Sequence, residues 1–396
     1  MYLSAFIHRD TLFEIAERWF CGQPGPGDAR QLTELLISDG FVAAETIRSM
    51  ARRFLTFLHA ESFTEERLRT KGELRDALCR GNGEEHTPRT AELLARYRAN
   101  PDYYYREVPV NGVLCLDGAQ RVCGMYRLKR PRRVAEKAQR KLARWLFAAV
   151  QARARAMAEA RARERDIPLA HLLTPPSEMS HEFIAAEEEV ARDFRVGAFR
   201  FDRAALTIRD VAGIKLVGSD DALAGLEAAL PGTPGMRVVD REVFAGRYRA
   251  TALVLEVPWD AEAVCRAYEE GRAWERYRGR GIPDARLRQG LAPLLAGAAP
   301  TLTVELMLTT FSDLVESELG RGLHEQRIIT QRDNREYTGY LPMNVEFLVE
   351  YLFAVAFSPR IEITELPIKL WGRYLPDTLT SHIRRLYGLP DPDLLD

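Results

Sequence analysis

The sequence is poor in cysteine and histidine, which excludes several kinds of metal site. Its five cysteines include no Cys-x-x-Cys pair, and it has only seven histidines. We therefore expect neither a zinc-finger site nor a disulfide framework, and the cytosol is favoured. Within residues 1–100, His59 and His86 have no neighbouring metal-ligand candidates, so we expect structural or surface roles for them.

Targeting segments and long apolar runs are also missing. The first 20 residues contain neither a basic region nor a long apolar stretch of the kind a signal peptide needs. The most apolar C-terminal run, residues 347–357, contains Glu350 and is shorter than the roughly 20 residues that span a bilayer. The sequence predicts a cytoplasmic protein without a membrane partner. Ser177 and Ser180 lack the context of a nucleophile elbow, so hydrolase chemistry is not supported.

The charge of the chain is balanced as a whole but uneven along its length. The 396 residues carry a net charge of -1 and are enough for two or three domains. Residues 121–165, however, hold 15 Arg and Lys against three Glu and no Asp. Such a basic segment suits a polyphosphate or a nucleic acid.

Three regions are expected from the pattern. Residues 1–100 show apolar spacing typical of helices and predict a helical N-terminal domain. Residues 101–335 alternate predicted strands and helices, which indicates an α/β domain with a mixed sheet. Residues 336–396 form a C-terminal extension with no recognisable site.

A hairpin and a long helix begin the α/β region. Residues 107–128 alternate apolar and polar positions around an Asp-Gly turn, so their second strand delivers Arg127 and Lys129 to its end. Pro131 suits a helix start, and the Ala- and Arg-rich residues that follow, to about 165, contain no Gly or Pro. This helix is either solvated or a surface for an acidic ligand, and residues 187–189 (EEE) offer an internal partner.

Two carboxylates accompany apolar strands. Asp210 opens the strand around residues 214–217, where it is either a capping acid or a metal ligand. Glu305 alternates with Val304 and Leu306 and so faces the other side of its strand, residues 301–308. A carboxylate within a buried sheet needs a partner, which favours a site role. Further helices are predicted at 219–230, 261–298 and 311–319.

Four motifs in one order carry a family resemblance. Residues 126–141 read YRLKRPRRVAEKAQRK, 210–217 DVAGIKLV, 247–252 RYRATA and 305–310 ELMLTT. They resemble the synthetase domain of the RelA/SpoT family of alarmone synthetases, whose motifs are G-R-I-K-S-P-x-S-I-x-x-K-x-x-R-K, D-I-A-G-I-R-V-I, G-Y-R-S-L-H and E-x-Q-I-R-T. The resemblance covers roughly residues 120–320, with two extra stretches at about 142–203 and 259–300.

The resemblance implies a nucleotidyltransferase-like core and a reaction. The family transfers the β,γ-pyrophosphate of ATP to the 3′-hydroxyl of a guanine nucleotide with Mg²⁺, which makes the (p)ppGpp alarmones of the stringent response. By this likeness Asp210 and Glu305 hold the metal and carry catalysis, and Tyr248 stacks on the acceptor base. The residues that would hold the phosphates of ATP are Arg127, Lys129, Lys137, Arg140 and Lys215.

Three positions depart from the family pattern. Ala252 stands in place of a His, Met307 in place of a Gln and Thr309 in place of an Arg. These losses remove groups that would orient the acceptor, whereas both acids remain. The alternatives are therefore a catalytically degenerate nucleotide-binding regulator, or a toxin-like synthetase that acts on the 3′ end of tRNA.

Overall fold

The computed structural model describes residues 1–59, 62–81, 86–320, 339–356 and 362–374, together with Ser381, Arg384 and Arg385. Its helices are α1 (Arg9–Phe20), α2 (Asp28–His59), α3 (Lys71–Leu78), α4 (Pro88–Ala99), α5 (Pro131–Glu164), α6 (Pro176–Arg195), α7 (Asp220–Ala229), α8 (Ala261–Glu270), α9 (Asp284–Arg288), α10 (Phe311–Leu319) and α12 (Tyr340–Val355). Its strands are β1 (Tyr2–Leu3), β2 (Thr64–Thr70), β3 (Pro109–Leu116), β4 (Val122–Leu128), β5 (Thr207–Ile208), β6 (Ala212–Val217), β7 (Arg237–Ala245), β8 (Arg249–Pro258) and β9 (Thr301–Thr309).

The core is a mixed sheet with helices on both faces. Within the described residues, seven strands follow the order β2-β3-β4-β6-β9-β8-β7. β6 and β9 are parallel, and the other neighbouring pairs are antiparallel. This confirms the predicted α/β architecture with a mixed sheet. The hairpin predicted at 107–128 is also confirmed, as β3 and β4.

One face of the sheet is covered by α2. This 32-residue helix packs against β4 and β6. The approach is close at Gly124 of β4, where an added Cβ atom would lie 3.1 Å from Leu55 of α2 and 2.9 Å from the carbonyl oxygen of Lys215. A larger residue at 124 would push the helix off the sheet. We refer to this covered side as the core face.

The opposite face is covered only in part, and we call it the open face. Leu114 of β3 and Met125 of β4 belong to an apolar cluster with residues of α3, α4 and α10. On this face Lys215 of β6 and most side chains of β9 and β8 are only half-buried. In β9, buried and half-buried residues alternate from Thr301 to Leu308, which confirms the period-two pattern predicted for this strand.

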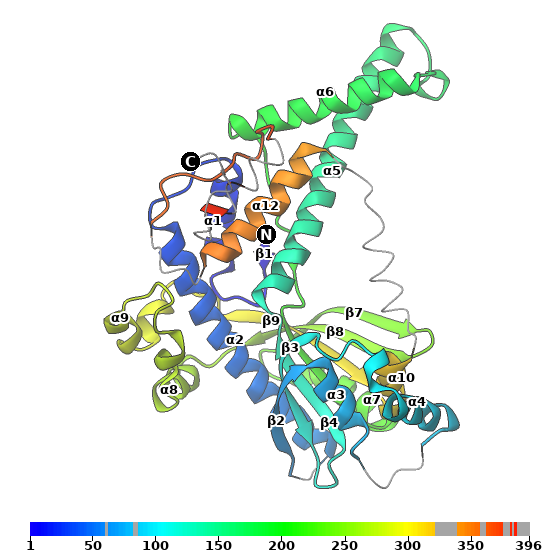
Figure 1. Cartoon of the computed structure of the whole chain (residues 1–396), viewed down its shortest axis with the longest axis vertical. Coiled ribbons are helices and arrows are strands. Elements are labelled where there is room, and N and C mark those ends of the chain that lie inside the picture. The colour runs from blue at the N-terminus through cyan, green and yellow to red at the C-terminus, as the bar shows by residue number, and fades with distance from the viewer. Residues whose placement is uncertain are drawn as a thin grey trace, which may run out of the picture.

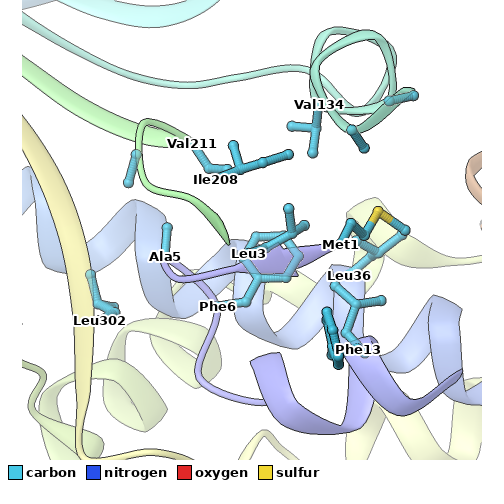
Figure 2. Close-up of a cluster of buried hydrophobic side chains, with 14 of the residues drawn as sticks. Met1, Leu3, Ala5, Phe6, Phe13, Leu36, Val134, Ile208, Val211 and Leu302 are labelled. Carbon is cyan, nitrogen blue, oxygen red and sulfur yellow. The ribbon is translucent and has the colours of Figure 1, made fainter. Parts of the chain in front are cut away.

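The N-terminal segment is built into the main core. β1 pairs in parallel with β5, with Tyr2 opposite Thr207 and Leu3 opposite Ile208. Figure 2 shows Leu3 in a buried cluster with Ile208 and Val211, and with Val134 of α5. Residues that surround the start of β6 are therefore fixed by apolar packing from three separate parts of the chain.

α5 and α6 form a long hairpin that projects from the body (Figure 1). α5 contains 34 residues, or roughly 50 Å at 1.5 Å per residue, and it confirms the helix predicted to begin at Pro131. Arg153 pairs with Glu189 at 3.2 Å and with Asp193 at 2.8 Å. The acidic residues of α6 thus partly neutralise the outer arginines of α5. This agrees with the prediction that residues 187–189 are an internal partner of the basic helix.

Two expectations differ from the structure, and a third is not tested by it. Residues 1–100 are not purely helical, because β2 joins the main sheet through pairing with β3. Residues 261–298 form only short helices, α8 and α9, because glycine and proline recur between residues 271 and 297. The boundary expected at 335 lies outside the described residues, and the division into domains stays a prediction. None of the described helices has the length and apolar character needed to cross a membrane.

Candidate functional site

Three neighbouring strands bring an arginine and a glutamate into one row of the open face. Arg127 of β4 is opposite Gly213 of β6, and Gly213 is opposite Glu305 of β9. Residues opposite one another in a sheet point to the same side, so both charged side chains project from the open face. A Cβ atom placed on Gly213 would lie 3.6 Å from Oε2 of Glu305. The Glu305 carboxylate therefore lies beside Gly213, between the strands that carry Arg127 and Glu305.

Asp210 stands at the entrance to β6 and is held by two lysines. The ammonium groups of Lys129 and Lys137 both form ion pairs with its carboxylate. Lys129 also donates from Nζ to the Asp210 carbonyl oxygen at 2.5 Å, and from its backbone N–H to Val211 at 2.8 Å. Val134, one turn before Lys137 on α5, and Val211 belong to the buried core (Figure 2). Apolar packing on one side thus positions the charged group on the other.

The electrostatics of this group follow from partial burial and close pairing. Burial alone would raise the pKa of Asp210, but the two ammonium groups outweigh it and bring the pKa down to about 2. Burial lowers the pKa of Lys129, and the charge of Lys137 adds to that effect while Asp210 opposes it. At neutral pH the cluster therefore has one negative and two positive charges, a net positive site for an anion.

Lys215 lies on the same face of β6, two residues beyond Gly213. Burial lowers its pKa to about 8, although Glu318 of α10 favours the charged form. The Lys215 Nζ atom is 4.0 Å from Glu318 Oε1, and Glu318 also binds Lys71, the first residue of α3, at 2.6 Å. Glu305 favours the charged form of both Lys129 and Lys215, which is consistent with its central position between them.

The remaining two predicted site residues lie farther out. Arg140 is exposed on α5 and pairs with Glu136 at 3.9 Å. Tyr248 precedes β8 and stacks on Phe244, with ring centroids 6.4 Å apart. Thr251, three residues after Tyr248, is opposite Leu308 near the end of β9, whereas Asp210 precedes β6. Tyr248 and Asp210 therefore lie on the order of 25–30 Å apart along the strands. The structure therefore brings six of the eight predicted residues together, with Arg140 at the rim and Tyr248 at the other end.

The positions that depart from the family pattern line the end of the face near Tyr248. Ala252 of β8 is directly opposite Met307 of β9, and both are half-buried. Thr309 is buried, and its hydroxyl group donates to the Arg249 carbonyl oxygen at 3.2 Å. This part of the face presents apolar or already bonded groups to a ligand.

The donor set for a metal consists of two carboxylates. In the part of the chain that the structure describes, no group of three or more His, Cys, Asp or Glu side chains could enclose a metal ion. Both Asp210 and Glu305 offer the hard oxygen atoms that Mg²⁺ prefers, and Glu305 has no ion pair with another described residue. Asp210, however, is occupied by Lys129 and Lys137. A polyphosphate that engages the two lysines would release Asp210. The two acids therefore fit Mg²⁺ when such a polyphosphate is bound.

Sequence reasoning missed Lys71 and Glu318. The start of α3 could have been found, because Thr70 and Glu73 form a capping box and match the Thr-x-x-Glu signature. The contact between Lys71 and Glu318, which also brings Lys71 near Lys215, could not have been found, because Lys71 and Glu318 are 247 residues apart in the sequence.

Comparison with known proteins gives one distant structural likeness. No family model and no curated protein matches the chain. The crystal structure of the small alarmone synthetase 1 from Bacillus subtilis matches at 14% sequence identity with a TM-score of 0.17. The match covers 51% of this chain and 66% of that chain, just under two thirds of it. A TM-score this low supports no transfer of residues or activity.

Proposed function

We propose that the protein is a divergent Mg²⁺-dependent pyrophosphokinase. It transfers the β,γ-pyrophosphate of ATP to the 3′-hydroxyl of a guanine nucleotide, as in (p)ppGpp synthesis. The observation that carries the proposal is the convergence of Arg127, Lys129, Lys137 and Lys215 around two carboxylates on one half-open sheet face. Four cations suit a triphosphate, and two acids suit the ion that travels with it.

The chemistry assigned to this chain is positioning and proton handling. The acceptor 3′-oxygen attacks the β-phosphorus of ATP, the bond from that phosphorus to the α,β-bridging oxygen breaks, and AMP leaves. The proton of the acceptor hydroxyl passes to Glu305, which has no ion pair with a described residue. Lys129 and Lys137 turn from Asp210 to the phosphates and offset their charge. When bound, Mg²⁺ neutralises charge that develops on the phosphate oxygens.

Labelled ATP tests this assignment directly. The full chain is incubated with Mg²⁺ and either γ-³²P-ATP or α-³²P-ATP, and with GDP, GTP, ATP or bulk tRNA in separate reactions. Transfer of the γ label and not the α label to a guanine nucleotide, with release of AMP and not ADP, supports the proposal. Transfer of the α label instead identifies a nucleotidyltransferase and overturns it. Transfer of the γ label to tRNA alone keeps the reaction but replaces the acceptor.

A catalytically degenerate nucleotide-binding regulator is the second candidate. It is favoured by the apolar pair Ala252 and Met307, which offers an acceptor no hydrogen bonds. Calorimetry with ATP and Mg²⁺ would then give binding without any product at saturation. Turnover that disappears in Glu305→Gln would exclude this candidate.

A further inference from the structure

Glu318 is a carboxylate enclosed by cations at the edge of the open face. Its side chain is 8% exposed, and both of its oxygens accept from Lys71 Nζ, at 2.7 and 2.6 Å. Lys215 approaches the same carboxylate at 4.0 Å. The three side chains come from α10, α3 and β6, so no local sequence rule brings them together.

The two lysines outnumber the acid that they surround. Lys71 and Lys215 contribute two positive charges, against one for Glu318, and their side chains are only 21% and 18% exposed. At 4.0 Å, Lys215 lies beyond ordinary hydrogen-bond distance, so its three N–H donors are not used by Glu318. A phosphate group has three terminal oxygens and a larger charge, and it could engage both lysines at once.

This group continues the candidate site. Lys215 lies two residues after Gly213 on β6, so it projects from the same face as Arg127 and Glu305. Arg127 and Glu305 both act on the pKa of Lys215, in opposite directions, which reflects their proximity. A chain of phosphates that begins at Lys129 would therefore extend along the face toward Lys71.

The backbone at this point is fixed independently of the Glu318 carboxylate. Arg75 of α3 donates from Nε to the Glu318 carbonyl oxygen at 3.1 Å, and its guanidinium group lies 5.3 Å from the centre of the Tyr104 ring. The hydrogen bond from Arg75 joins α3 to the backbone of α10 and does not involve the Glu318 carboxylate. A rotation of the Glu318 side chain away from the lysines would leave this bond in place.

We propose that Lys71 and Lys215 form a further phosphate subsite, and that Glu318 occupies it until a polyphosphate displaces the carboxylate. The inference rests on the proposed function, because it extends the same phosphate site. It assigns Lys71 as a phosphate-binding residue and Glu318 as an internal competitor of the ligand. A purely structural ion pair, by contrast, would stabilise the fold without any effect on anion affinity.

The test measures the binding of inorganic tripolyphosphate to the full chain by titration calorimetry, without metal. Glu318→Gln removes the competing charge but keeps an acceptor oxygen for Lys71, so the dissociation constant should fall about tenfold. Lys71→Met should raise it about tenfold. Glu316→Gln is the matched control, because the Glu316 side chain is similarly buried on α10, with 11% exposed, but pairs with Arg89 at 2.9 Å. This control should leave binding unchanged.

The outcomes separate this inference from the proposed function. If Lys129→Met weakens tripolyphosphate binding whereas Glu318→Gln and Lys71→Met do not change it, the subsite is wrong and the main phosphate site stands. If the wild-type chain does not bind tripolyphosphate, both are overturned. Thermal unfolding identifies a variant that does not fold. If Glu318→Gln does not fold, the test rests on Lys71→Met, which leaves Glu318 facing Lys215. If Lys71→Met does not fold, the double variant Lys71→Met with Glu318→Gln replaces it. Unchanged tripolyphosphate affinity in the variants that fold rejects the subsite.

Discussion

The β4–β6 half of the open face and its β8–β9 end differ in chemistry, although they belong to one sheet. The first half holds Arg127, Lys129 and Lys215 with Asp210 nearby, and its cations are set by packing from α3, α5 and α10. The other end holds Ala252 and Met307. Glu305 lies between them. Groups suited to a phosphate donor therefore lie in the first half, whereas Ala252 and Met307 offer an acceptor no polar group at the other end.

Removal of either acid should have the largest effect, because both halves depend on them. We expect Asp210→Asn and Glu305→Gln each to lower the turnover number by about 10²–10⁴-fold with the fold intact. Steady-state kinetics and circular dichroism measure this. Glu256→Gln is the control, since Glu256 faces the same side of the sheet but binds Thr301 at 2.8 Å and Arg237. Full activity in either acid variant would contradict the assignment.

A change at Tyr248 should affect only the acceptor. We expect Tyr248→Ala to raise the KM for the acceptor about tenfold, because a stacked base is lost, and to leave the KM for ATP unchanged. Tyr248→Phe retains an aromatic face and should behave like the wild type. An equal rise in both KM values would show that Tyr248 does not distinguish the two ends of the face.

A change at Lys137 should affect only the donor. Lys137→Met removes one of the two lysines at Asp210, and we expect the affinity for ATP to fall about tenfold. Arg155→Met removes the same charge farther along α5, where Arg155 is 74% exposed and pairs with Glu159. Calorimetry should detect no change in that control. Equal losses would indicate a general charge effect in place of a defined contact.

The donor end should also depend on pH above neutrality. Lys215 has a pKa of about 8 and that of Lys129 is lowered, so both lose charge as the pH rises from 7 to 9. We expect the affinity for tripolyphosphate to fall about fivefold over this range. Lys215→Arg should flatten the profile, because arginine stays charged. Deprotonation of Lys215 should not lower the free energy of unfolding. Between about pH 8 and 10.5 the unfolded chain binds more protons at this residue than the folded chain, so its contribution to stability rises with pH.

Met307→Ala should have the smallest effect. Met307 is half-buried at the apolar end, directly opposite Ala252. We expect the ATP affinity to change by less than about twofold. A larger loss, measured by the same calorimetry, would mean that the donor reaches past Glu305 into the apolar end, and the division of the face would then fail.

Local patterns predicted the elements of the site better than its assembly. Alternation around Glu305 and the basic end of the hairpin at Arg127 were readable, because strand period and turn chemistry are local properties. β7 was missed because it is exposed along almost its whole length and so has no buried face to read. The contact between Lys71 and Glu318 could not be predicted from the sequence, because only tertiary packing brings residues so far apart together.

The helix α10 links the two ends of the open face. Glu318 near its C-terminal end holds Lys71, and Asp313 in its first turn accepts from the backbone N–H of Arg249 at 2.7 Å, next to Tyr248. The two acids are five residues apart, roughly 7.5 Å along a helix axis. For the proposed donor and acceptor, we expect this short connection to make the two affinities depend on each other. Thermodynamic linkage then requires the dependence to be reciprocal, so each substrate should change the dissociation constant of the other by the same factor.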